Sequence, residues 1–298
     1  MPPGDLMTVP GQYQFDHPDG GKLLMGKLTP IRMVTVGGLL GSWDVRRQVT
    51  DRVGDHGGFA GSKPTLTSRT ITLDMTFLFK TGAEAEKALD AAMAVFPPFG
   101  DVEADGVFSF WRRGKQPRMV FATAKRSHFE GNYETSVGKI SGVVELEALD
   151  PRVYALNEVQ SQVGLPIAQG GRRYPRVYPL LFGATNANGN LVITNDGNIP
   201  SPPILRIHGP VTNPYVLNSR VDRELRFMGT IAQGDYLEID TDTKSIRLNG
   251  SESRRTMLDP VSRWWTLVPG PNDIRFLART NEVGARLEIF SRSAWNSG

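Results

Sequence analysis

Apolar and polar residues alternate strictly within residues 234–250. Leu237 and Ile239 alternate with acidic residues, and after a polar turn Ile246 and Leu248 alternate with an arginine and an asparagine. A period of two is typical of a β-strand with one buried and one solvated face. The pattern therefore predicts a β-hairpin at this position.

A second alternating pair occupies residues 264–276, on either side of the turn-forming run at residues 269–273. We interpret it as a second hairpin. Trp264 and Trp265 are adjacent, so on a strand one ring would face the core and the other the surface. The outer ring could stack on a glycan or cover a partner contact, and packing in a core or an interface is the favoured interpretation.

One segment alone has a helical pattern. Thr81 followed by Glu84 forms a capping box, and apolar residues then recur at spacings of three and four. Pro97 and Pro98 would end the helix. The residues of the predicted apolar stripe are Ala85, Ala88, Leu89, Ala92, Met93 and Phe96.

The remaining patterned segments all have the period of strands. They lie at residues 71–79, 107–111, 118–124 and 144–148 in the first half, and at 191–193, 204–208, 225–227 and 286–290 in the second. Short strands at spacings of about ten residues are typical of β-sandwiches and jelly rolls. The predicted fold class is mainly β. Residues 1–155 would form a sandwich or barrel with one packed helix, 156–179 an inter-domain crossing, and 180–298 a β-sandwich domain.

An excursion at about residues 44–68 interrupts the first domain, and its glycines concentrate in residues 53–63. A loop of this length in a compact domain is either functional or disordered. One interpretation is a plain surface loop, and the other is an arm that orders against a neighbouring subunit, where glycines permit close backbone approach. The candidate subunit-interface residues are Arg46, Arg47, Arg52, Asp55, Gly57, Gly58 and Phe59.

Composition narrows the possible functions. The chain of 298 residues has no cysteine, which excludes disulfides, thiolate metal sites and cysteine nucleophiles. The formal net charge is only +3 and no cationic cluster suggests a nucleic-acid interface. The densest basic run, at residues 172–176, is interpreted as a solvated linker. No signal peptide and no membrane-spanning segment is recognisable, so we expect a soluble protein made in a cytoplasm.

Candidate chemistry is sparse. The four histidines, His17, His56, His128 and His208, have no ligand-like spacing. Glu238, Asp240 and Asp242 share the wet face of one predicted strand, where a carboxyl group would lack the burial that a general acid needs. The calcium-loop-like start at Asp240 fails because Lys244 occupies a ligand position. We therefore expect no catalytic residues, no bound metal and no cofactor.

Several motifs taken together resemble the distal tail proteins of siphophages. These are Ser68 to Phe77 (SRTITLDMTF), Val144 to Tyr154 (VELEALDPRVY), Asn195 to Gly209 (NDGNIPSPPILRIHG), Asn213-Pro214, and the two predicted hairpins, in the family's order along nearly the whole chain. The glycine-rich excursion lies where that family has its belt. The long crossing at residues 157–179 departs from the family pattern.

The resemblance implies a structural virion protein of a tail tip. Its expected fold is a tail-tube-like first domain followed by a galectin-like or jelly-roll domain. Its implied partners are five further copies in a hexameric ring, the tail tube protein, the tail hub and receptor-binding proteins. DNA would pass through the channel without specific binding, no membrane insertion is expected, and synthesis would take place in the host bacterial cytoplasm.

The sequence leaves two rival functions open. A carbohydrate-binding module acting in host-surface adhesion would use an exposed tryptophan on a β-sandwich. An endolysin-like glycosidase would depend only on the exposed carboxylates of one strand. The mass in solution discriminates between a ring and a monomeric module.

Overall fold

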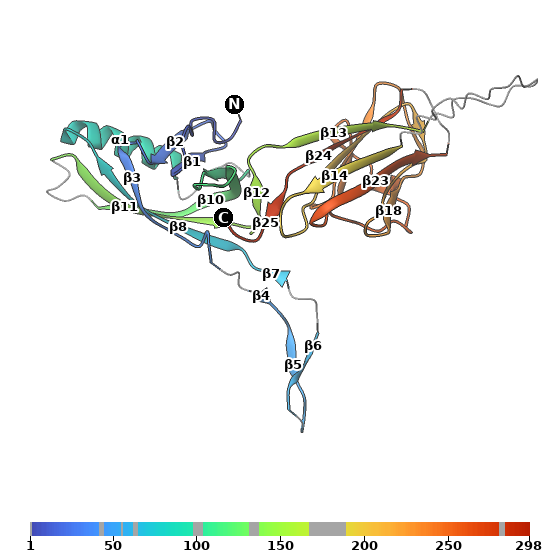
Figure 1. Cartoon of the computed structure of the whole chain (residues 1–298), viewed down its shortest axis with the longest axis horizontal. Helices are drawn as coiled ribbons and strands as arrows, with labels where there is room; N and C mark the ends of the chain where they lie inside the picture. Colours follow the sequence, from blue (N-terminus) through green and yellow to red (C-terminus); the bar gives the residue numbers. More distant parts are fainter. Residues whose placement is uncertain are drawn as a thin grey trace, which may run out of the picture. The chain divides into compact units, whose positions relative to one another are not determined.

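The computed structural model describes residues 2–41, 45–54, 56–61, 65–97, 104–130, 137–166, 189–279 and 284–298. The chain divides into two compact units, Met1–Leu156 with Trp295–Gly298 and Asn157–Ala294 (Figure 1). Each unit has its own cluster of buried apolar side chains. Antiparallel strands make up most of both units, which confirms the mainly β class.

A nine-stranded antiparallel sheet forms the body of the first unit. Its main path runs β2-β1-β9-β10-β11-β8-β3, and β12 and β25 attach at the side through β10. The strands are β1 (Gln12–Asp16), β2 (Lys22–Gly26), β3 (Ile31–Gly37), β8 (Arg69–Leu78), β9 (Gly106–Phe110), β10 (Arg118–Glu130), β11 (Lys139–Ala148), β12 (Val153–Ala155) and β25 (Ala294–Trp295).

Strand β10 joins two halves of this sheet. Its first five residues pair with β9, and from Thr123 onward it pairs with β11, with a register shift between Ala124 and Arg126. Irregularities of this kind let one strand turn a corner and belong to two layers. The strands predicted at residues 71–79, 107–111, 118–124 and 144–148 correspond to β8, β9, β10 and β11.

Helix α1 (Gly82–Val95) confirms the predicted helix. The hydroxyl of Thr81 accepts the Glu84 N–H at 3.3 Å, as a capping box requires. Ala85 and Ala92 pack into the same apolar cluster as Phe77, so the helix covers the core side of β8. Met93 is the exception in the predicted stripe because its side chain is exposed.

The excursion is a β-ribbon and not an irregular loop. Its strands are β4 (Val45–Arg46), β5 (Val49–Asp51), β6 (Gly58–Ala60) and β7 (Thr65–Leu66), with β4 paired to β7 and β5 paired to β6. These four strands form two-stranded ladders that pair with no other strand of the described chain. We call residues 45–66 the arm.

Two sheets packed on a shared apolar core form the second unit. One has the order β13-β24-β15-β20-β21-β22 and the other the order β14-β23-β17-β18. Their strands are β13 (Val159–Gly164), β14 (Asn190–Asn195), β15 (Ile204–His208), β17 (Pro214–Asn218), β18 (Arg223–Arg226), β20 (Tyr236–Asp240), β21 (Ser245–Leu248), β22 (Glu252–Ser253), β23 (Gly270–Ala278) and β24 (Arg286–Ser291). A small ladder of β16 (Val211–Thr212) and β19 (Thr230–Ile231) and a 3-10 turn, η1 (Arg255–Met257), complete the unit.

The first predicted hairpin is present and the second is wrong. Strands β20 and β21 pair from Leu237↔Leu248 to Asp240↔Ser245. The run at residues 269–273 is not a turn between paired strands, because β23 begins at Gly270 and pairs with β14 and β17 instead. The buried amide of Asn272 donates to the Val268 and Gly270 carbonyls at 2.8 and 2.9 Å. These bonds satisfy the backbone carbonyls of the bend that leads into β23.

The predicted crossing also needs correction. Residues 159–164 form β13, which pairs along its whole length with β24. Only Val163 of this strand is buried, so its sequence lacks an apolar period and the backbone pairing could not be read from side chains. Residues 167–188, which include the basic run at 172–176, lie outside the described residues.

Candidate assembly surfaces

The arm displays apolar side chains that its own chain does not bury. The phenyl ring of Phe59 is 61% exposed and the side chain of Val49 is 56% exposed. The other exposed large apolar residues of the arm are Val45, Val53 and Leu66. Exposed apolar residues scattered singly are ordinary, but five in one ribbon, with Val49 and Phe59 on opposite faces, favour a partner that contacts both faces.

Glycines shape the tip of the arm. Gly54 and Gly57 have φ of 83° and 91°, a left-handed conformation that other residues rarely adopt, and the Arg52 N–H donates to the Gly57 carbonyl at 3.0 Å. Gly58 pairs with Asp51 across the ribbon, and a Cβ on Gly58 would come within 2.7 Å of Val49 Cγ1. Gly54 and Gly57 therefore permit the tight turn of this hairpin, and Gly58 leaves room for the side chain of Val49.

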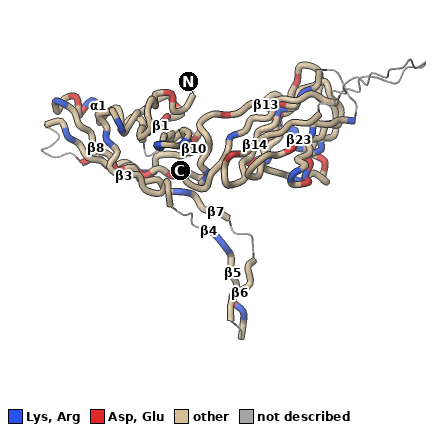
Figure 2. The backbone as a smooth tube through the Cα atoms, viewed as in Figure 1, with Lys and Arg blue, Asp and Glu red and all other residues tan. Residues whose placement is uncertain are grey.

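The structure gathers most of the predicted interface residues on this ribbon. Arg46 lies in β4 and Phe59 in β6, and both are exposed, as is Arg47. The guanidinium of Arg52 stacks on Phe59. Asp55 lies outside the described residues. Figure 2 shows cationic segments of the arm near β4 and near its tip.

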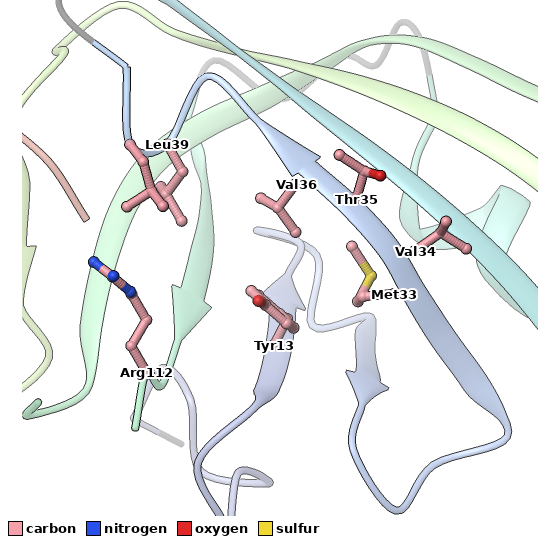
Figure 3. Close-up of a pocket in the computed structure, with 8 residues that line it drawn as sticks. Tyr13, Met33, Val34, Thr35, Val36, Leu39 and Arg112 are labelled. Carbon is pink, nitrogen blue, oxygen red and sulfur yellow. The ribbon is translucent and has the colours of Figure 1, made fainter. Parts of the chain in front are cut away.

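A shallow hollow of about 180 Å³ lies on the first unit, between β1 and β3. Figure 3 shows Tyr13, Met33 and Val36 around it, with Arg112 and Leu39 at one end. The register shift between Met33 and Thr35 puts an extra residue in β3, so Met33 and Val36 both pack toward the core. Burial raises the pKa of Tyr13, and the charge of Arg112 partly opposes this rise. Sequence patterns gave no sign of this hollow.

Three arginines of the first unit hold the last residues of the chain. Arg69 Nη2 donates to the Asn296 carbonyl at 2.6 Å, Arg118 Nη1 to the Ser297 carbonyl at 3.0 Å, and Arg112 Nη1 to the Gly298 carbonyl. The Gly298 N–H donates to the Leu39 carbonyl at 3.0 Å. The tail is thus an integral part of the first unit, a relationship too distant in sequence to be predicted.

Charged groups on the outer face of the β13–β22 sheet are paired with one another. Arg206 Nε donates to Glu238 at 2.7 Å, and Arg286 Nε lies 3.0 Å from Glu288. His208 Nε2 lies 3.1 Å from the other oxygen of Glu288. Burial acts to raise the pKa of Glu288, but the hydrogen bond from Arg286 and the contact with His208 outweigh it and hold this pKa below its ordinary value. Carboxylates held ionised in this way are poor general acids.

The two predicted tryptophan contacts differ in accessibility. Trp265 is only 2% exposed and lies in the core of the second unit, so its ring cannot act as a surface platform. Trp264 is half-buried against the same core, and its carbonyl accepts a bond from Arg223. Any glycan or partner contact at this position would fall to Trp264.

The acidic hairpin end does not form a cation site. Asp240 Oδ1 accepts the N–H groups of Asp242 and Thr243 at 2.8 and 3.3 Å, a turn that uses the carboxylate internally. Across the described residues, no group of three or more His, Asp or Glu side chains is arranged to hold a metal ion. The helices found there also fall short of the length and apolarity that a bilayer span requires.

Known proteins resemble this chain in part of its sequence and in its fold. Residues 196–289 match the family described as siphovirus-type tail component, C-terminal domain. No curated protein matches the sequence. Two solved structures are similar over 94% of this chain. One is SPP1 Dit (gp 19.1), described as a paradigm of the hub adsorption apparatus in phages infecting Gram-positive bacteria, with 12% identity, a TM-score of 0.60 and 98% of that chain covered.

The second is the phage P2 baseplate in its activated conformation with Ca, with 13% identity, a TM-score of 0.52 and 97% of that chain covered. Both likenesses concern the fold of the whole chain, and the family match concerns the second unit. Residues 196–289 thus resemble the C-terminal domain of siphovirus-type tail components, and the fold of the whole chain is similar to that of SPP1 Dit.

Proposed function

We propose that this protein is a structural component of the tip of a long non-contractile phage tail. Six copies form a ring that joins the tail tube to the tail hub. The arm of each copy lies against the first unit of its neighbour, and the second unit supports receptor-binding proteins. The protein acts in the virion after synthesis in the host cytoplasm, and it acts without catalysis.

The observation that carries this proposal is the arm. Burial of a fully exposed apolar side chain contributes about 1.5–3 kcal/mol, and each of these five partly exposed side chains would contribute a share of that on docking, in a contact repeated around the closed ring. The exposed cations of Arg46 and Arg47 could add ion pairs of about 0–1 kcal/mol each at the rim.

The charge distribution supports a channel that releases DNA. Lysine plus arginine number 34 against 31 acidic residues, and Figure 2 shows both signs interspersed along the two units. Tight nucleic-acid binding requires a concentrated cationic surface. A near-neutral ring would let a genome pass without specific binding.

The mass of the purified protein in solution tests the proposal. A ring predicts six times the chain mass of 32.8 kDa by light scattering, and annular particles in negative stain. Immunogold labelling of the parent phage should place the protein at the tail tip. A monomer at all concentrations, or label along the whole tail, would contradict the proposed role.

Carbohydrate binding in host adhesion remains the second candidate, and it rests on Trp264. This ring keeps an exposed part beside a rigid sandwich core. A Trp264→Ala variant should lose binding to host polysaccharide if Trp264 is the contact, whereas substitution of the buried Trp265 would unfold the unit and give no information. Unchanged binding by Trp264→Ala would remove this candidate.

A further inference from the structure

A second hollow, of about 430 Å³, lies on the C-terminal unit at the end of the β20–β21 hairpin. Its lining includes three cationic side chains, Lys244, Arg247 and Arg255, and four hydroxyl-bearing residues, among them Ser245 and Ser253. No aspartate or glutamate is among the described residues that line it. Hydroxyl and cationic donors without a carboxylate are the composition of an anion site.

Backbone contacts fix the segments that carry these cations. Lys244 has a φ of 58° at the hairpin turn, and its carbonyl accepts a bond from Arg255 Nη1 at 2.6 Å. The Arg254 N–H donates to the Ile246 carbonyl at 2.9 Å, which ties η1 to β21. Arg247 is exposed on β21 and lies opposite Ser253 of β22. These contacts hold the backbone of Lys244, Arg247 and Arg255 together at the end of the β20–β21 hairpin.

The acidic groups of the neighbouring strands are already occupied. Glu238, which faces Arg247 in the sheet register, binds Arg206 at 2.7 Å. Glu252 binds Arg254 at 2.9 Å, and Asp240 accepts backbone N–H groups of its own turn. Lys244 and Arg247 thus bring positive charge to a lining that contains no carboxylate, and Glu238, opposite Arg247 on the neighbouring strand, reduces this positive potential only in part because it is paired with Arg206.

We propose that this hollow binds a phosphate group carried on an ester. Arginine and lysine are favoured phosphate partners, and serine and threonine hydroxyls can donate to the remaining oxygens. A water molecule takes about 30 Å³ in the liquid, so the hollow has room for an alcohol portion beyond the oxyanion. All residues that line the hollow lie between positions 243 and 255 of the second unit.

Titration calorimetry at low ionic strength tests the site, with inorganic phosphate and glycerol phosphate as separate probes. Saturable binding of either supports a phosphate site. Tighter binding of glycerol phosphate identifies an ester as the ligand, and tighter binding of inorganic phosphate identifies the free ion. Added NaCl should weaken the binding, because the site is exposed.

A charge-matched pair of variants supplies the control. The double variant Lys244→Gln/Arg247→Gln should weaken binding about tenfold or more, since charge-assisted hydrogen bonds are strong. Arg263→Gln/Arg275→Gln removes the same charge from exposed positions of the same unit and should change the affinity less than about twofold. Far-UV spectra should match the parent for both. No saturable heat in the parent, or equal weakening in both variants, would overturn the proposal.

Discussion

The guanidinium carbon of Arg52 lies 4.6 Å from the centroid of the Phe59 ring, across the ribbon of the arm. A cation over an aromatic face stabilises an exposed pair by about 0.5–1 kcal/mol. The contact orders two long side chains near the hairpin end of the β5–β6 ladder. The Phe59 ring is thus ordered before docking, which lowers the entropic cost of burying it.

Phe59 should contribute to assembly and not to folding. Phe59→Ala leaves the melting temperature unchanged, because the ring is 61% exposed, and it weakens subunit association about tenfold or more. Sedimentation velocity across a concentration series measures the shift. Val261→Ala, at a residue 64% exposed on the second unit, is the control and should assemble as the parent does. Equal weakening by both substitutions would mean that Phe59 has no special role.

Removal of residues 295–298 should destabilise the first unit by a few kcal/mol. The deletion takes away the carbonyl acceptors of Arg69, Arg112 and Arg118, and hydrogen bonds to charged groups contribute about 1.5–3 kcal/mol each. It also removes the Trp295 ring, over which Arg118 stacks at 3.9 Å. Urea unfolding measures the loss. Ser297→Ala keeps every one of these acceptors and should unfold at the parent's urea concentration.

Asn272 should be indispensable to the second unit. Its amide donates to the Val268 and Gly270 carbonyls, and its Oδ1 accepts the Val268 N–H at 3.1 Å, all in a fully buried position. Asn272→Ala leaves these backbone groups without partners and should cost about 2–4 kcal/mol in unfolding free energy. Thermal unfolding checks this, with the exposed Asn190→Ala as control. A cost below about 0.5 kcal/mol would show that the bend does not need this side chain.

The bend at Asn272 could be predicted from the sequence, but the strands that pair with β23 could not. Period-two patterns located β8, β11, β20 and β21, because one face of each strand is apolar and buried. Prolines and glycines before Asn272 indicated a turn, and a turn-like bend is present. Which strand then pairs with β23 is decided by contacts with β14 and β17, remote in sequence, and no local pattern encodes them.

Strand β1 has no apolar alternation that would predict it, for a related reason. Gln12 and Gln14 are buried although they are polar, because Gln12 Oε1 accepts the Thr8 and Val9 N–H groups and Gln14 Oε1 accepts the Leu6 N–H. Burial on both faces erases the expected alternation. Among the candidate assembly surfaces, the glycine pattern of the sequence predicts only the excursion. The hollow beside Tyr13 and the arginines that hold the tail depend on residues that are distant in the sequence.

The ionised carboxylate of Glu288 should stabilise the second unit at pH values above the folded-state pKa of this residue. That pKa is lowered, so the stabilisation is fully present above the ordinary value of 4.5 and is lost as pH falls through the folded-state value. Glu288→Gln should therefore unfold more easily than the parent at about pH 7, and this difference should shrink toward zero in acid. Urea unfolding at several pH values measures it. A difference independent of pH would exclude the carboxylate charge as its source.

Replacement of residues 49–60 by a short Gly-Ser link tests the assembly role of the arm most directly. Far-UV spectra and thermal melts should match those of the parent, because β5 and β6 pair only with each other in the described chain and all their side chains are exposed. Light scattering should then give six times the chain mass for the parent and the mass of a single chain for the variant. A shortened protein that assembles to the parent's mass would contradict the proposal that the arm joins one copy to the next.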